Sequence, residues 1–162
     1  MRSAMAIAVA GVLAMLLQTT LFPTLRLPLV PDLMLVLTAY LGMRHGGVGG
    51  VAGAFLLGYF LDTFSGTVLG MHTLALTVAY AVVHLVARTL WTEGSVLAVG
   101  VVFLAGCVRA AATVGAAALA GLSAPVWAHE LRFGLVDATV AALLSPFVFR
   151  FVAWEKRLLG VG

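Results

Sequence analysis

Long apolar stretches, separated by short polar or proline-containing segments, dominate the chain. Several of them are long enough for a helix to cross the hydrocarbon core of a bilayer, which takes roughly 20 residues. The pattern predicts an all-α integral membrane protein: a single domain, residues 1–162, folded as a six-helix transmembrane bundle with a short second helix. The predicted spans cover approximately residues 4–22, 32–43, 47–64, 70–87, 95–119 and 133–152.

The second apolar segment is too short for an ordinary span. Leu33 to Met43 gives roughly 17 Å of helix at ~1.5 Å per residue, against a hydrocarbon core of ~30 Å. It can form a short buried helix, a re-entrant segment, or a span completed by its neighbours. Asp32 precedes it and is a typical N-cap residue, so the helix is expected to begin directly after Asp32.

Two longer connections are expected between the spans. One contains Pro23, Pro28 and Pro31, and the other covers Gly121 to Arg132. Proline removes a backbone donor and fixes φ, which favours loops or interfacial segments at these places.

The stretch from Gly42 to Gly70 holds the densest run of glycine in the chain. Small residues recur there at every fourth position, which places them on one face of a helix. Because small residues let helix backbones approach closely in membranes, this face is predicted to pack against another helix, and Gly49 and Gly53 widen it. The face consists of Gly46, Gly50, Ala54 and Gly58.

Composition and charge support the membrane interpretation. Hydrophobic residues make up 63% of the chain and charged residues 9%, against about 25% charged in average soluble domains. The basic residues lie singly between apolar segments, which indicates topology and not nucleic-acid binding. If both termini are cytoplasmic, the inner side holds Arg2, Arg44, Arg88, Arg150, Lys156 and Arg157, and the outer side holds Arg26 and Arg132.

No motif for catalysis, nucleotide binding or metal binding is present in the sequence. There is no phosphate-binding loop, no G-x-S-x-G and no H-E-x-x-H. Cys107 is the only cysteine, and His72 and His84 are too far apart on one predicted helix to share a metal ion. We therefore expect a protein that is not an enzyme, with no catalytic residues, no cofactor and no metal. The N terminus lacks a small-residue cleavage site and is read as an uncleaved first helix.

Polar and ionisable side chains in or beside the predicted spans are the candidates for function, because charge in hydrocarbon is costly. Arg109 needs an acidic partner, and Asp137 or Asp62 lies at a suitable depth. The group can serve as an internal ion pair, as an outward-facing pocket for a ligand or a partner peptide, or as an ion path, although only His84 and a few threonines lie further toward the inner side. The candidates are Gln18, Asp32, Asp62, His72, Arg109 and Asp137.

An ordered set of short motifs runs through residues 18–70. The motifs are Gln18-Thr19-Thr20-Leu21-Phe22-Pro23, Pro31-Asp32-Leu33, Tyr40-Leu41-Gly42 with Arg44, Gly53-x-x-x-x-Gly58, Asp62, Ser65-Gly66 and Leu69-Gly70. In these motifs the chain resembles the rod shape-determining protein MreD family, while residues 71–162 resemble it only in hydropathy. The positions that match the family are Gln18, Pro31, Asp32, Gly58, Asp62, Gly66 and Gly70.

The resemblance implies a non-enzymatic scaffold of the cell-elongation machinery in the bacterial inner membrane. It implies an MreC-like membrane protein as the partner, and through it MreB and the RodA–PBP2 peptidoglycan synthase, with membrane lipid around the bundle and no nucleic acid. It also implies a fold similar to the substrate-binding subunits of energy-coupling-factor transporters. The alternative function is therefore a small-molecule-binding membrane subunit of that transporter type, which would carry a metabolite and pair with an ATPase module.

Overall fold

The computed structural model describes residues 2–18, 32–65, 69–89, 95–121 and 124–158, and the regular structure in these residues is entirely helical. This confirms the all-α fold class for the described part of the chain. The described helices are α1 (Arg2–Leu16), α3 (Leu33–Arg44), α4 (Val48–Ser65), α5 (Met71–Thr89), α6 (Ser95–Leu119) and α7 (Ala124–Leu158).

Three of the described helices contain segments long and apolar enough to cross a membrane. These segments are Met71–Thr89, Val96–Leu119 and Arg132–Trp154. Leu33–Arg44 and Val48–Phe64 are shorter apolar helices. The three long helices support a membrane protein, and the count of six spans stays a prediction.

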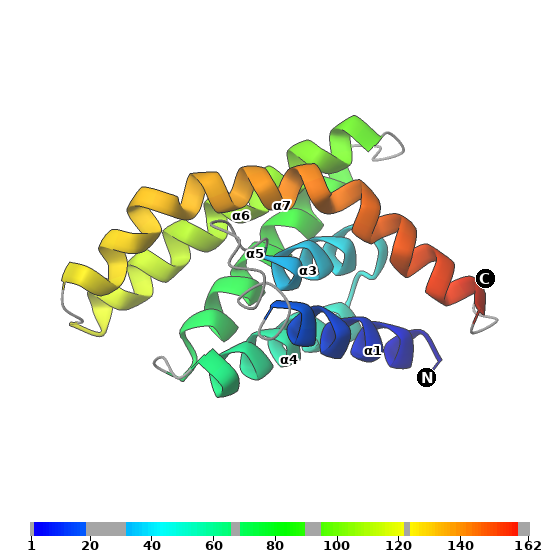
Figure 1. The fold of residues 1–162 in the computed structure, drawn as a ribbon, viewed down its shortest axis with the longest axis horizontal. Helices are drawn as coiled ribbons and strands as arrows, with labels where there is room; N and C mark the ends of the chain where they lie inside the picture. Colours follow the sequence, from blue (N-terminus) through cyan, green and yellow to red (C-terminus); the bar gives the residue numbers. More distant parts are fainter. Residues whose placement is uncertain (1, 19–31, 66–68, 90–94, 122–123, 159–162) are drawn as a thin grey trace.

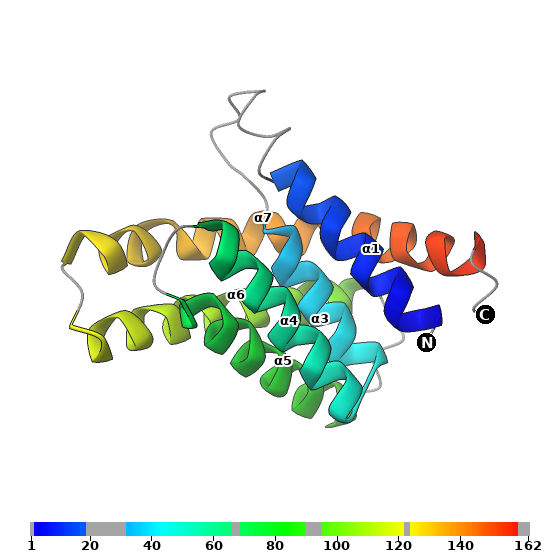
Figure 2. The ribbon, with the colours of Figure 1, turned by 90° about the horizontal axis from the view of Figure 1, so that it is seen from below.

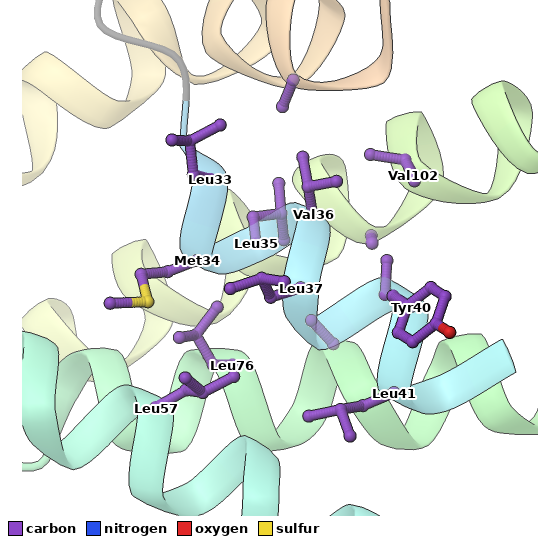
Figure 3. Close-up of a cluster of buried hydrophobic side chains, with 14 of the residues drawn as sticks. Leu33, Met34, Leu35, Val36, Leu37, Tyr40, Leu41, Leu57, Leu76 and Val102 are labelled. Atoms are coloured by element: carbon purple, nitrogen blue, oxygen red, sulfur yellow. The ribbon is translucent and has the colours of Figure 1, made fainter. Parts of the chain in front are cut away.

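α3 lies at the centre of the molecule and contacts each of the other five described helices. Every residue from Leu33 to Gly42 is buried, as expected for a helix that is apolar on all sides. Figure 3 shows Leu57 of α4 and Leu76 of α5 on one side of α3, and Val102 of α6 on another. The short second segment is therefore a buried helix enclosed by its neighbours. Its crossing of the bilayer stays a prediction.

The small residues of α4 lie against α5. A Cβ atom added at Gly58 would overlap the Thr73 backbone, and one added at Gly46 would lie 2.6 Å from His84 Cε1. Ala54 is fully buried on the same face. Gly53 faces Leu41 of α3. The helical spacing of Gly53, Ala54 and Gly58 thus corresponds to close packing inside the bundle, whereas Gly46 precedes α4 and is exposed.

Gly49 differs from the other glycines of α4. A Cβ atom built at this position would have no heavy atom within 4 Å. The prediction that Gly49 widens the packing face is therefore wrong. Successive residues of a helix point about 100° apart, so Gly49 is directed away from the face that Gly50 shares with Ala54 and Gly58.

The described helices alternate in direction along the chain (Figures 1 and 2). The Arg44 end of α3 and the Thr89 end of α5 lie toward the same side as the Arg2 end of α1 and the Leu158 end of α7. This alternation is the arrangement expected of an up-and-down bundle.

α7 is longer than the predicted sixth span. It begins at Ala124 and continues to Leu158 as a helix of 35 residues, so the predicted loop from Gly121 to Arg132 is wrong over most of its length. Pro125 falls in the first turn, where a helix tolerates proline because the N–H group there has no partner within the helix. Figure 1 shows α7 arching over α3 and alongside α6.

Some sequence predictions fall outside the described residues. They concern Thr19, Thr20, the three prolines at 23, 28 and 31, and Gly66. The predicted N-cap is described, however: Asp32 caps α3 by accepting a hydrogen bond from the N–H of Leu35 at 2.9 Å. The predicted start of this helix is confirmed.

We predict that Gly58→Ala destabilises the protein, because the added methyl group meets the backbone of Thr73 and not a flexible side chain. Overpacking of this kind costs about 1–3 kcal/mol, and each kcal/mol corresponds to roughly 2–4 °C in a protein of this size. Thermal unfolding of the purified protein in detergent measures the effect. Gly49→Ala is the matched control and should leave the melting temperature unchanged or raise it. Equal melting temperatures for the two variants would contradict close α4–α5 packing.

Candidate functional site

Asp62, near the end of α4, caps the next helix, α5. Its side chain is buried, and its carboxylate accepts hydrogen bonds from the N–H groups of Gly70 (3.0 Å), His72 (2.9 Å) and Thr73 (3.0 Å) and from the Thr73 hydroxyl. The first N–H groups of a helix have no partner inside the helix, and the helix dipole favours negative charge there. Asp62 therefore joins the end of α4 to the start of α5.

Gly70 allows this cap to form. Its φ of +97° lies in the left-handed region that favours glycine. The turn brings the Gly70 N–H toward the Asp62 carboxylate, within hydrogen-bond distance. A side chain with a Cβ atom at this position would strain the backbone.

Asp32 makes two different contacts with its two carboxylate oxygens. Oδ1 accepts the hydrogen bond from Leu35 that caps α3, and Oδ2 lies 3.2 Å from Nε of Arg109 on α6. Both side chains are largely buried. The ion pair therefore fixes the start of the central helix to the middle of α6.

One of the two acids predicted to pair with Arg109 binds elsewhere. Asp62 was one of the two acids expected to pair with it, and this expectation is wrong because the Asp62 carboxylate is occupied by the start of α5. The ion pair is formed with Asp32. Pairing of Arg109 with Asp137 stays a prediction.

The other end of α3 is held by two side chains of α5. The Tyr80 hydroxyl donates to the carbonyl oxygen of His45 at 2.9 Å, and Nδ1 of His84 lies 3.1 Å from the carbonyl oxygen of Gly42. A carbonyl only accepts, so the proton of this bond is on Nδ1 of His84. The two rings stack with centroids 5.8 Å apart. Together they bind carbonyl groups that the end of a helix leaves without partners.

Gly50 leaves the space that Tyr80 occupies. A Cβ atom at Gly50 would overlap both the Tyr80 hydroxyl and the His45 carbonyl oxygen. Sequence reasoning gave no role to Tyr80. Its spacing of four residues from His84 is the available signal, since it places two polar aromatic rings on one face of α5.

Comparison with models of protein families identifies a match. The family model for rod shape-determining protein MreD matches residues 2–154 of the chain. The chain belongs to the MreD family. No curated protein and no solved structure matches it. The predicted likeness to energy-coupling-factor subunits therefore stays a prediction.

Membership of the MreD family supports a role in rod shape determination. The family is one of structural, shape-determining proteins and is not known for enzymatic activity. The family and the three long apolar helices together identify a membrane protein.

The predicted site residues of this MreD family member do not form one cluster but take part in separate contacts. Asp32 and Arg109 form one, and Asp62 with the start of α5 forms another. The His72 backbone belongs to the second contact, while its side chain is half-buried. Gln18 follows α1, Asp137 lies on α7, and both are half-buried. Their use as a ligand pocket or partner contact stays a prediction.

We predict that Asp62→Leu strongly destabilises the protein. The substitution leaves three N–H groups and one hydroxyl at the start of α5 without their acceptor. One hydrogen bond to a charged group contributes about 1.5–3 kcal/mol, so the loss should be at least that large. The measurement is the melting temperature in detergent.

Thr63→Ala is the control for Asp62→Leu. Thr63 is the neighbouring residue, is exposed, and uses its hydroxyl only on the Tyr59 carbonyl of its own helix. Its variant should behave like wild type. A wild-type melting temperature for Asp62→Leu would show that the cap contributes nothing.

A substitution at Asp32 can distinguish the contribution of the ion pair to stability from that of the helix cap. Asparagine is also a good N-cap residue, so Asp32→Asn should keep the cap and lose only the charge that faces Arg109. Breaking a buried pair by removing one partner costs about 3–5 kcal/mol, whereas replacing both partners by apolar residues is often close to neutral. We therefore predict that Asp32→Asn with Arg109→Met is more stable than Asp32→Asn alone. Additive losses in this double-mutant cycle would contradict the pairing.

Proposed function

We propose that this MreD family member is a non-enzymatic membrane scaffold of the bacterial cell-elongation machinery. Its partner is an MreC-like membrane protein, which connects it to MreB and to the RodA–PBP2 peptidoglycan synthase. The observation that carries the proposal is the match to the MreD family over residues 2–154.

The contacts of the ionisable residues are consistent with a scaffold. The carboxylates of Asp32 and Asp62 cap helices, and Arg109 holds one of those caps. His84 binds a helix-terminal carbonyl. Each of these groups thus has a part in holding the bundle together. A bundle held together by such contacts suits a protein that presents outer surfaces to a partner in the membrane.

We further propose an inner-membrane location with both termini in the cytoplasm. Arg44 and Arg88 occupy the last turns of α3 and α5. These ends lie toward the same side as the described chain ends (Figure 2). Basic residues near the ends of spans favour the cytoplasmic side, which supports this orientation.

The lipid-facing surface supplies the candidates for the partner contact. Several large apolar side chains are exposed on different helices. One labelled position on each of these helices can therefore show whether a partner contacts that face of the bundle. Suitable positions for a photo-crosslinking amino acid are Phe55 on α4, Leu85 on α5, Phe103 on α6 and Phe151 on α7.

We predict that the MreC-like protein crosslinks from one of these faces and not from all four. A fixed interface occupies one face of the bundle, while lipid covers the others. The measurement is mass spectrometry of crosslinked products from native membranes. The matched control is the same amino acid at buried Val102, where no partner can reach it.

Affinity purification from the native membrane tests the function itself. The scaffold should co-purify with an MreC-like protein, and its loss should convert rods to rounded cells. A bound metabolite together with an ATPase module would favour the transporter subunit instead. Rods that keep their shape without the protein would overturn the proposal.

A further inference from the structure

α7 contains a proline in its interior. Pro146 has no N–H group, so it cannot donate to the carbonyl oxygen of Ala142, the residue four positions earlier. A carbonyl without a donor is costly away from water. The Ser145 hydroxyl supplies the missing donor, because it lies 2.7 Å from the Ala142 carbonyl oxygen and is fully buried.

The two halves of α7 pack on different helices. Before Pro146, a Cβ atom at Gly106 of α6 would overlap Ala138, which shows how closely α6 and α7 approach there. After Pro146, the ring of Phe149 packs edge-on against Tyr40 of α3, with centroids 5.4 Å apart. The helix changes direction in its middle part (Figure 1), as helices do at proline.

We propose that Ser145 and Pro146 form a hinge in α7. The arm before the hinge stays fixed to α6, and the arm after it, residues 147–158, moves relative to α6. Proline removes one backbone hydrogen bond at this point, and helices bend sharply where such a bond is missing. The Ser145 hydroxyl limits the motion by holding the Ala142 carbonyl.

The hinge connects to the end of the central helix. Tyr40 packs on Phe149 of the moving arm, and its ring also lies 6.3 Å from the ring of His45. His45 follows α3 and is the residue whose carbonyl Tyr80 binds. A shift of the arm is therefore transmitted through Tyr40 to the turn between α3 and α4. This inference does not depend on the MreC-like partner.

Distances between pairs of spin labels test the hinge in the full chain in nanodiscs. One label is placed at Leu119, at the end of α6, and the other at Leu143 before the hinge or at Trp154 after it. All three positions are exposed. They are changed to cysteine in a Cys107→Ala background, so that only the chosen pair is labelled.

We predict that the Leu119–Trp154 distance distribution is broader than the Leu119–Leu143 distribution. Pro146→Ala restores the N–H donor to α7 and should narrow the Trp154 distribution to the width of the Leu143 one. Ser145→Ala removes the hydroxyl and should broaden the Trp154 distribution further. Neither variant should change the Leu143 distribution.

Thr139→Ala is the matched control. Its hydroxyl donates to the Leu135 carbonyl of the same helix at 2.7 Å, but the next residue is Val140 and not a proline, so both distributions should stay as in wild type. Equal widths for the two pairs in wild type would overturn the hinge. An unchanged Trp154 distribution in Pro146→Ala would overturn it as well. If Pro146→Ala fails to fold, Ser145→Ala provides the test, and an unchanged Trp154 distribution in that variant would overturn the hinge.

Discussion

The bundle depends on the hydrogen bonds that bind the backbone N–H and carbonyl groups at the two ends of its central helix. α3 is buried from Leu33 to Gly42, so the backbone groups near its ends need hydrogen-bond partners from the protein. Asp32 supplies the acceptor at the first turn, and Tyr80 and His84 bind carbonyl groups at the last. In an apolar surrounding each such group would otherwise cost several kcal/mol. The contacts that meet this requirement also connect α3 to α5 and α6.

The same principle explains why polar residues are placed where they are. Asp32 and Asp62 each bind the start of a helix, where the backbone offers donors and the dipole favours a carboxylate. Arg109 balances the charge of one of them inside the bundle. The Ser145 hydroxyl donates a hydrogen bond to the Ala142 carbonyl, which has no backbone donor because Pro146 lacks an N–H group. Most of the buried polar side chains described for this MreD family member thus form hydrogen bonds with backbone groups that have no partner within their helix.

Local patterns made part of this fold predictable. The four-residue spacing of Gly50, Ala54 and Gly58 follows helical geometry, and a proline followed by an acid marks the start of α3. The start of α7 was missed because polar residues and Pro125 were read as a loop, although proline is acceptable in a first turn.

The partners of the acids were harder to predict. Asp32 and Arg109 lie far apart in the sequence, and only the packing of α3 against α6 brings them together. The cap at Asp62 spans a turn of a few residues, and the nearby Gly70 was its one local signal. Reasoning from membrane depth could only predict which residues share a level of the bundle, and it did not distinguish which helices were neighbours.

The enclosure of α3 has a consequence for biogenesis. Its neighbours include α1, which is synthesised before it, and α4 to α7, which are synthesised after it. At 12 residues, α3 is shorter than the roughly 20 that a translocating segment needs to partition into lipid by itself. Its contacts with α6 and α7 can form only after these two helices have been synthesised. The enclosure of α3 is therefore completed later than the synthesis of α3 itself, by helices that follow it in the described part of the chain.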